Sequence, residues 1–143
     1  MAVRALFTAY AASLPVDLSY QGFAEELAGL PGAYAPPTGA LLLARGGDGG
    51  PLGCVALRAM PTPGWSEMKR LYVLPEARGM GLGRSLVLTV IDAARKAGYR
   101  HLALDTLPSM TDAQQVYQRL GFVPTTPYYD TPVEGTVFLT LRL

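Results

Sequence analysis

A glycine-rich run separates a strand-like segment from a helix-like segment in the middle of this chain. The run consists of Arg78, Gly79, Met80, Gly81, Leu82, Gly83 and Arg84. The apolar residues 71–74 precede it, and the helical pattern of residues 85–97 follows it. Glycines allow the main chain to approach a ligand, and the free N–H groups of a first helical turn point toward an anion. The order of strand, turn and helix therefore predicts a binding site for a phosphorylated small molecule.

The composition indicates one folded domain, which we expect to extend over residues 1–143. Half of the residues are hydrophobic and 16% are charged, a balance typical of a chain with a buried core. The formal net charge of +1 argues against a broad basic surface for nucleic acid. No apolar run approaches the ~20 residues of a membrane span, so we expect no membrane partner. Whether the chain is a monomer or a homodimer stays open.

The cysteine and histidine contents bear on compartment and on metal binding. Cys54, the single cysteine, lies in an apolar stretch, so we expect a buried thiol, no disulfide within the chain and a cytoplasmic location. His101 is the single histidine and opens a strand-like segment, where an edge or surface position is expected. With one residue of each kind, a zinc site is not expected.

The hydrophobic pattern predicts an α/β fold with a mixed, mostly antiparallel central sheet flanked by helices. Expected strands cover residues 40–44, 51–59, 65–73, 100–104 and 137–143. Expected helices cover residues 4–13, 17–30, 83–97 and 111–120, with Gly98 ending the third and Thr111 or Asp112 capping the fourth. Residues 71–104 then form a central βαβ unit. Side chains of residues 65–73 are expected to alternate, with Glu67, Lys69, Leu71 and Val73 on one face.

Two motifs in this order resemble the GCN5-related N-acetyltransferase (GNAT) superfamily. The first is Arg78-x-x-Gly81-x-Gly83, which is similar to the acyl-CoA pyrophosphate loop of that superfamily. The second is Ala113-x-x-x-Tyr117-x-x-x-Gly121-Phe122, which resembles its late helix. The resemblance covers roughly residues 40–143. It implies the GNAT fold, with the βαβ unit binding acyl-CoA, and an N-acetyltransferase that uses acetyl-CoA as co-substrate and no metal.

The resemblance also implies how the donor is bound. Main-chain N–H groups of residues 79–84, together with Arg78, are expected to hold the pyrophosphate of coenzyme A. Leu71, Tyr72 and Val73 are expected to pair through their main chain with the pantetheine arm, at a place where two parallel strands separate. Because the contacts come from the main chain, the side chains at these strand positions are expected to matter little.

Tyr117 is the expected general acid. The tyrosine of the family's late motif lies near the sulfur of coenzyme A, and a phenol with a pKa near ~10 is protonated at neutral pH. Protonation of the leaving thiolate is the role that the resemblance implies. The alternative is a packed core residue, since Val116, Tyr117 and Leu120 also stand at the spacing of an apolar helix face.

Glu67 is the expected general base. Acylation of an amine requires removal of a proton from R–NH3+, and some family members carry a glutamate at this place in the central strand. The carboxylate can act directly or through a water molecule. The alternatives are an ion pair with Lys69 or Arg70, or a plain surface position.

The acceptor side is less defined. Many family members have an asparagine at the place of Met110, and Ser109 or Asp105 is a possible substitute. Tyr128 and Tyr129, with Asp130, can form an acceptor pocket through cation–π and charge contacts; packing on the sheet edge is the alternative. Tyr34 can approach from the other side.

A small-molecule amine is the expected substrate. Direct attack in a ternary complex is the expected route, because no cysteine is placed to carry the acyl group. The alternatives are a non-catalytic acyl-CoA-binding or regulatory domain and an acetyltransferase acting on protein amines. A dinucleotide-binding oxidoreductase is disfavoured, because the glycine-rich turn follows the third expected strand rather than the first.

Overall fold

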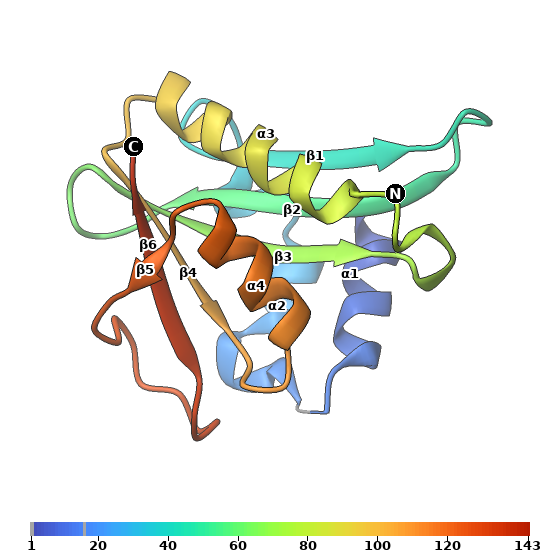
Figure 1. Cartoon of the computed structure of the whole chain (residues 1–143). Helices are drawn as coiled ribbons and strands as arrows, with labels where there is room; N and C mark the ends of the chain where they lie inside the picture. Colours follow the sequence, from blue (N-terminus) through green and yellow to red (C-terminus); the bar gives the residue numbers. More distant parts are fainter. Residues whose placement is uncertain (1, 16) are drawn as a thin grey trace.

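The computed structural model describes residues 2–15 and 17–143, which form a six-stranded sheet with helices on both faces (Figure 1). The strands are β1 (Ala40–Arg45), β2 (Pro51–Ala59), β3 (Trp65–Val73), β4 (His101–Thr106), β5 (Val123–Pro124) and β6 (Val137–Arg142). The α-helices are α1 (Ala2–Ser13), α2 (Phe23–Ala28), α3 (Leu82–Lys96) and α4 (Thr111–Arg119). Short 3-10 helices are η1 (Leu18–Gln21), η2 (Gly32–Tyr34) and η3 (Pro75–Ala77). None of the helices in the described ranges is long and apolar enough to span a membrane.

The sheet confirms the predicted mixed, mostly antiparallel architecture. Its strand order is β1-β2-β3-β4-β6-β5, and every neighbouring pair is antiparallel except β3 with β4. Helix α3 connects these two parallel strands, as the predicted βαβ unit requires. The bounds of β2 and β3 agree with the predicted strands, whereas the two-residue strand β5 was not predicted. Short strands of this kind carry too little pattern to be recognised.

The two parallel strands separate partway along their length. Their pairing begins at Trp65 with His101 and ends at Glu67 with Ala103, although β3 continues to Val73 and β4 to Thr106. The second half of β3 therefore has no strand partner on the β4 side. This opening places main-chain groups of β3 next to the start of α4, which follows β4 after a short loop.

A β-bulge in β3 changes which side chains face which layer. Tyr72 pairs with Cys54, but Lys69 pairs with Ala56, so β3 has one extra residue between these pairs. Arg70 lies there with a φ of 61°. A bulged residue reverses the alternation of the strand. The predicted alternation through residues 65–73 is therefore wrong beyond Lys69: Leu71 packs in the same core as Met68.

Helices α3 and α4 cover one face of the sheet, and α1 and α2 cover the other (Figure 1). The first core is centred on the apolar face of α3, whose buried residues are Leu86, Val87, Val90, Ile91 and Ala94. The second core joins α1 to the opposite face of the sheet through Val3, Leu6, Phe7, Cys54, Ala56 and Tyr72. Burial of apolar area on both faces is the main source of stability for such a sheet.

The ends of α3 and α4 differ in how closely they follow the predictions. Gly98, with a φ of 90°, follows α3, and its N–H bonds Arg95 O while the N–H of Tyr99 bonds Ala94 O, which confirms the predicted stop. For α4 the predicted cap by Thr111 or Asp112 is wrong. Met110 occupies the cap position and makes no side-chain hydrogen bond to the helix.

The predicted helix over residues 17–30 is divided into two short elements. Asp17 caps η1 by accepting a hydrogen bond from Ser19 N at 2.8 Å, and Gly22 then adopts a left-handed φ of 70° before α2 begins. The prediction of one helix is wrong because Gly22 interrupts it, although Phe23, Leu27 and Leu30 still pack against the second core.

Candidate active site

A groove runs along the free side of β3 and continues past the glycine-rich turn. Its volume is about 490 Å³, and it separates the end of β3 and the start of α3 from the start of α4. We call it the outer groove, lined by residues 71–73, 77–79, 81–84, 109–113 and 116, with Tyr10 and Ser13 from α1. The predicted donor-binding residues therefore gather here, except Met80, which is 63% exposed and does not line the groove.

The glycine-rich turn presents main-chain donors to the outer groove. Gly79 and Gly81 have φ values of 85° and 76°, which few other residues adopt. A Cβ atom at either position meets no atom within 4 Å, so the requirement for glycine comes from conformation rather than from space. Ser85 N makes the first hydrogen bond back, to Gly81 O, and the preceding N–H groups of α3 have no helical partner. Free N–H groups at the N-terminus of a long helix are suited to bind an anion.

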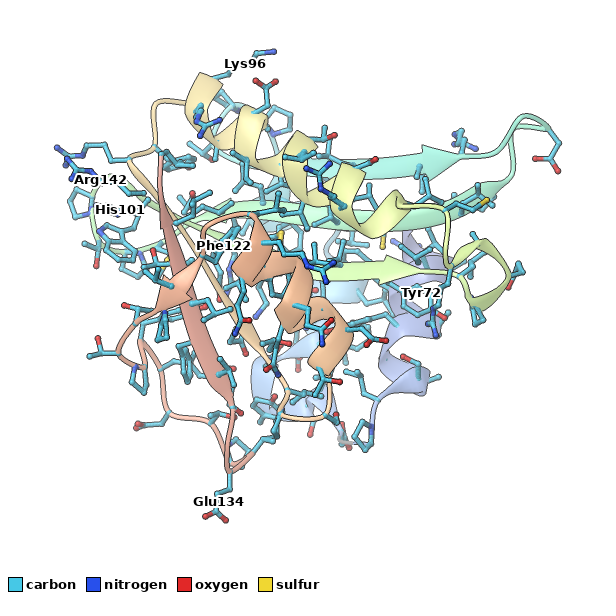
Figure 2. The ribbon with its side chains drawn as sticks, viewed as in Figure 1. Tyr72, Lys96, His101, Phe122, Glu134 and Arg142 are labelled. Carbon is cyan, nitrogen blue, oxygen red and sulfur yellow. The ribbon has the colours of Figure 1, made fainter. Side chains whose placement is uncertain are left out.

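Arg78 is held across the end of β3. Its Nε donates a hydrogen bond to Val73 O at 3.0 Å, and its guanidinium lies 5.8 Å from the ring centre of Tyr72. Figure 2 shows Tyr72 at this end of the sheet, next to the turn. The arrangement keeps a positive charge at the groove edge, where it adds to the field of the helix N-terminus.

A smaller pocket adjoins the outer groove at the place where β3 and β4 separate. Its volume is about 70 Å³, and we call it the inner pocket. It shares Tyr10, Leu71, Met110 and Ala113 with the outer groove. Its polar lining comes from five elements: Tyr10, Tyr20, Gln21, Lys69, Arg70, Asp105, Thr106 and Tyr117. A ligand that extends along the outer groove thus reaches polar side chains at its inner end.

Tyr117 lies on α4 and lines the inner pocket. The residue is 5% exposed, and its ring packs 5.7 Å from that of Phe122, which Figure 2 places beside the same helix. Burial raises the pKa of the Tyr117 phenol well above its ordinary value of 10.0. The hydroxyl therefore stays protonated throughout the physiological pH range and can donate a hydrogen bond into the pocket.

Glu67 is buried, lines neither hollow, and has both oxygens engaged. Arg58 Nη2 and Nε lie 2.8 and 2.9 Å from Glu67 Oε1, and the Tyr128 hydroxyl donates to Oε2 at 2.9 Å. Lys69 Nζ lies 3.8 Å from Oε2, which is the pair that the sequence left open. Arg58 and Tyr128 were not foreseen as its partners.

Arg70 forms a second saturated pair on the same face. Its Nε and Nη2 donate to the two carboxylate oxygens of Glu26 at 2.8 and 3.1 Å, and its Nη1 donates to Gln21 Oε1 at 2.7 Å. This bidentate geometry is the strong form of an arginine–carboxylate contact. The sequence offered Arg70 as a possible partner of Glu67, but the bulge directs it under α2, where it pairs with Glu26 instead.

Lys69 and Asp105 face each other across the separated strands. Lys69 Nζ lies 3.9 Å from Asp105 Oδ1, and the Lys69 side chain is 5% exposed. Burial lowers the pKa of the Lys69 ammonium, and the carboxylates of Glu67 and Asp105 oppose that shift in part. Asp105 Oδ2 accepts a hydrogen bond from the Tyr129 hydroxyl at 2.5 Å.

Tyr128 and Tyr129 close over the carboxylates from the side of the loop after β5. Their rings pack edge-on against Phe138 at 5.1 and 5.5 Å, and burial raises the pKa of both phenols well above 10.0. Neither lines the outer groove or the inner pocket, and Asp130 is exposed. Their hydroxyls bond Glu67 and Asp105, and their packing on Phe138 of β6 corresponds to the alternative of aromatic packing on the sheet.

The remaining reactive residues lie apart from the two hollows. Cys54 is fully buried, and burial raises the pKa of its thiol to about 12, which confirms the predicted structural role. His101 stacks on Trp65 with ring centres 4.3 Å apart, near Arg142 and at the end of β4 opposite the inner pocket (Figure 2). Tyr34, the last residue of η2, is buried and does not line the inner pocket.

Sequence reasoning missed Tyr10, Tyr20 and Gln21 as site residues. They belong to α1 and η1, where no motif distinguishes a pocket residue from a packed one. Lys69 was noted only as a partner of Glu67. The available signal was its position in a strand with Glu67 and Arg70, because three charged residues in an otherwise mostly apolar strand indicate a polar site.

Comparison with known proteins places the chain in a family. The model of the acetyltransferase (GNAT) family matches residues 4–122. An uncharacterized N-acetyltransferase of Schizosaccharomyces pombe is 41% identical over 140 residues, covering 98% of this chain and 86% of that protein. The chain belongs to the GNAT family of acetyl-CoA-dependent N-acetyltransferases.

Solved structures agree with this assignment. A protein from Klebsiella pneumoniae described as an acyl-CoA N-acyltransferase has a TM-score of 0.73 at 28% identity, over 97% of this chain and 90% of that chain. Nourseothricin acetyltransferase has a TM-score of 0.63 at 28% identity, over 74% and 66%. A GNAT acetyltransferase of Elizabethkingia anophelis, solved with acetyl-CoA bound, has a TM-score of 0.63 at 26% identity, over 74% and 77%.

Proposed function

We propose that this acetyltransferase transfers an acetyl group from acetyl-CoA to a primary amine of a small molecule, by direct attack in a ternary complex. The observation that carries the proposal is the continuity of the two hollows. The outer groove has an anion site at one end and adjoins, at the other, a buried polar pocket that contains Tyr117. Donor and acceptor can therefore meet where β3 and β4 separate.

The outer groove suits the donor in three respects. The N-terminus of α3, with Arg78 beside it, offers charge and main-chain donors to the pyrophosphate. Residues 71–73 have no strand partner on the β4 side, so their main chain is available to the pantetheine arm. The acetyl-CoA complex of the Elizabethkingia relative supports the same ligand class for this chain. No group in the groove calls for a metal ion.

Tyr117 is the proposed general acid. Attack of the amine nitrogen on the thioester carbonyl forms the new C–N bond, and collapse of the tetrahedral intermediate breaks the C–S bond. The thiolate leaving group then takes the phenolic proton of Tyr117, and the second proton of the attacking nitrogen restores the Tyr117 phenol. The location of Tyr117 in the inner pocket supports this role, and its raised pKa ensures that the proton is present before the reaction.

Glu67 is the proposed acceptor of the proton that leaves the amine. Because Glu67 lines neither hollow and its oxygens are bonded to Arg58 and Tyr128, the proton has to reach it through a water molecule. Lys69 lies between Glu67 and the pocket, 3.8 Å from Oε2. The hydrogen bonds from Arg58 and Tyr128 keep the carboxylate of Glu67 oriented between turnovers.

The small volume of the inner pocket favours a small amine over a protein amine, because at about 70 Å³ it does not admit an extended peptide. The buried thiol of Cys54 favours direct transfer over an acyl-cysteine intermediate. The relative that acts on the antibiotic nourseothricin, a small molecule, is consistent with this class of acceptor.

The test is release of coenzyme A from acetyl-CoA in the presence of a panel of amino acids, polyamines, aminoglycosides and peptides. We expect turnover with a small amine, and loss of most of that turnover in Tyr117→Phe with unchanged coenzyme A binding. Coenzyme A binding without turnover on any acceptor would favour the non-catalytic alternative. Turnover on peptides alone would favour the protein-modifying alternative.

A further inference from the structure

Three cations and three carboxylates lie between the sheet and its cover of α2 and the 124–136 loop. The cations are Arg58, Lys69 and Arg70, and the carboxylates are Glu67 and Asp105 of the sheet and Glu26 of α2. Two of the resulting pairs are complete: Arg58 bonds Glu67, and Arg70 bonds Glu26, each at 2.8–3.1 Å. Buried charges of this kind are stable only when paired and hydrogen-bonded. Neither Arg58 nor Glu67 lines the inner pocket, and Glu26 and Gln21 occupy the guanidinium of Arg70, so neither pair offers an unsatisfied charge to a ligand there.

The third pair, Lys69 and Asp105, is incomplete. Its atoms lie 3.9 Å apart, beyond hydrogen-bonding distance, and the Lys69 ammonium lies 3.8 Å from Glu67. The three N–H donors of Lys69 make no hydrogen bond to any side chain or carbonyl in the described residues. Asp105 uses Oδ2 for Tyr129 and leaves Oδ1 without a donor. An ammonium and a carboxylate oxygen, both with free capacity, therefore line the inner pocket.

The other groups around the inner pocket do not alter this charge pattern. Burial raises the pKa of Tyr10 and Tyr117, so both phenols are neutral at physiological pH, and the Gln21 amide carries no charge. Arg70 is the one further charged residue of its lining, and Glu26 neutralises it. Lys69 and Asp105 thus determine which charges the pocket accepts.

Building on the proposed function, we propose that the acceptor is a small zwitterion that carries an amine and a carboxylate, such as a short amino acid. Asp105 binds the ammonium group and Lys69 binds the carboxylate. In this arrangement each unsatisfied partner gains a charge-assisted hydrogen bond, and the pocket stays electrically neutral. An amine without a carboxylate leaves the buried Lys69 ammonium near Glu67 but without a hydrogen-bond acceptor, which is the less favourable state.

The size of the inner pocket agrees with this class. A water molecule requires roughly 10–15 Å³ of cavity volume. The inner pocket, with a volume of about 70 Å³, therefore holds about five groups of that size. Glycine has a comparable number of non-hydrogen atoms, and β-alanine is slightly larger. Specificity built on hydrogen bonds to a buried charge is strong, because an analogue that lacks the matching group leaves that charge unpaired.

The experiment compares acceptors that differ only in the carboxylate. Coenzyme A release is measured with glycine against glycinamide and ethylamine, and with β-alanine against its amide and propylamine. We expect kcat/KM to be at least tenfold higher for the better of the two acids than for its amide. The amide is the stricter control, because its amine is less basic and a larger fraction is neutral, a bias that opposes the expected result.

Variants at Lys69 assign the preference to this residue. In Lys69→Met we expect the ratio of kcat/KM between acid and amide to fall at least tenfold, and in Lys69→Arg to be largely restored, because the charge returns. Lys96→Met is the matched control, since Lys96 is an exposed residue of α3 that pairs only with Asp92. Thermal unfolding and acetyl-CoA binding establish that each variant is folded.

The outcomes separate this inference from the proposed function. Equal turnover of acids and amides, or a preference that survives in Lys69→Met, overturns the zwitterion and leaves small-amine acetylation intact. If no acceptor releases coenzyme A, the proposed function fails. Calorimetric titration of glycine and β-alanine into the protein with coenzyme A bound then tests the zwitterion site by itself. Binding of an acid but not of its amide then supports the zwitterion site, and absence of binding overturns it.

Discussion

The glycine-rich turn and the charged face around the inner pocket offer different kinds of group to a ligand. The turn is a contiguous segment, residues 78–84, whose donors are main-chain N–H groups at a helix start. The charged face combines side chains of β2, β3, β4, α2 and the loop after β5. One site is thus local and largely independent of side-chain identity, and the other depends on tertiary structure and on single side chains.

This difference explains why the donor could be inferred from a motif and the acceptor could not. A main-chain anion site needs particular φ values, and glycines in a short segment reveal them. A site built from distant charges has no spacing to recognise. Substitutions in the two regions should therefore fail in different ways: changes in the turn affect donor affinity, and changes on the charged face affect acceptor selectivity and stability.

The largest effect is expected at the junction of the two regions. In Tyr117→Phe we expect kcat to fall by about 10²-fold, because the leaving thiolate loses its proton donor, with little change in coenzyme A affinity. Tyr99→Phe is the control, since the Tyr99 hydroxyl bonds Thr38 O outside both hollows. Steady-state rates and coenzyme A titrations provide the two quantities. A Tyr117→Phe enzyme with full kcat would reduce this tyrosine to a packing residue.

Donor binding is expected to weaken by about 30-fold in Gly81→Val. A β-branched residue resists a φ of 76°, and the strain, of about 2 kcal/mol, displaces the main-chain donors from the anion. Gly49→Val, at a φ of 84° in the β1–β2 turn, introduces similar strain away from the site. Calorimetric titration with acetyl-CoA should show a lower affinity in Gly81→Val and an unchanged affinity in Gly49→Val. Equal affinity in both variants would contradict an anion site at this turn.

Stability is expected to fall in Glu67→Gln. The amide keeps its shape but leaves Arg58 without a counter-charge, and because Arg58 is 36% exposed we expect a loss of about 2 kcal/mol rather than the larger cost of a fully buried pair. Urea unfolding of Glu67→Gln and of Asp92→Asn measures this. The second substitution affects an exposed pair on α3, and its unfolding midpoint should not change.

A smaller effect is expected in alkaline solution. Burial raises the pKa of Tyr10 to about 12, so above pH 10 the unfolded chain loses this proton while the folded chain retains it. Stability then falls as pH rises from 10 toward 12, by on the order of 1 kcal/mol per pH unit for this residue. Unfolding free energies across this window should fall less steeply in Tyr10→Phe than in the parent. Identical slopes would exclude Tyr10 as a contributor.

Ionisation of Lys69 changes the stability in the opposite direction, and in a lower pH window. Burial lowers its pKa, so below 10.5 the unfolded chain binds this proton more readily than the folded chain, and stability rises with pH up to that point. In Lys69→Met we expect that rise to be absent. The same urea titrations, extended down to neutral pH, measure it, and an unchanged rise would show that Lys69 titrates normally.

The layout of the sheet could be predicted from the sequence because its strands and helix α3 carry strong periodicity between clear turns. Helix α3 and its stop at Gly98 follow from one apolar stripe and one glycine. The bulge at Arg70 could not be predicted, because an extra residue in a strand leaves the composition unchanged and appears only in the pairing with β2. The interruption at Gly22 is similar, since a glycine is compatible with both a helix and its end.

The same distinction applies to the site. The residues of the turn were predicted together, whereas the partners of Glu67 were not, because Arg58 and Tyr128 reach it from elements nine and 61 residues away. The bulge also decides that Lys69 and Arg70, consecutive in sequence, both face the polar layer. The partners of Lys69 and Arg70 could be identified only from the register of β3 and from the elements that cover it.

The most direct test of this division between the two regions is a crystal structure of the protein with coenzyme A. We expect the pyrophosphate on the N–H groups of residues 79–84, the pantetheine arm along residues 71–73, and the sulfur within about 3.5 Å of the Tyr117 hydroxyl, at the mouth of the inner pocket. A complex with the pyrophosphate away from the turn, or with the sulfur directed away from Tyr117 and the inner pocket, would contradict this account.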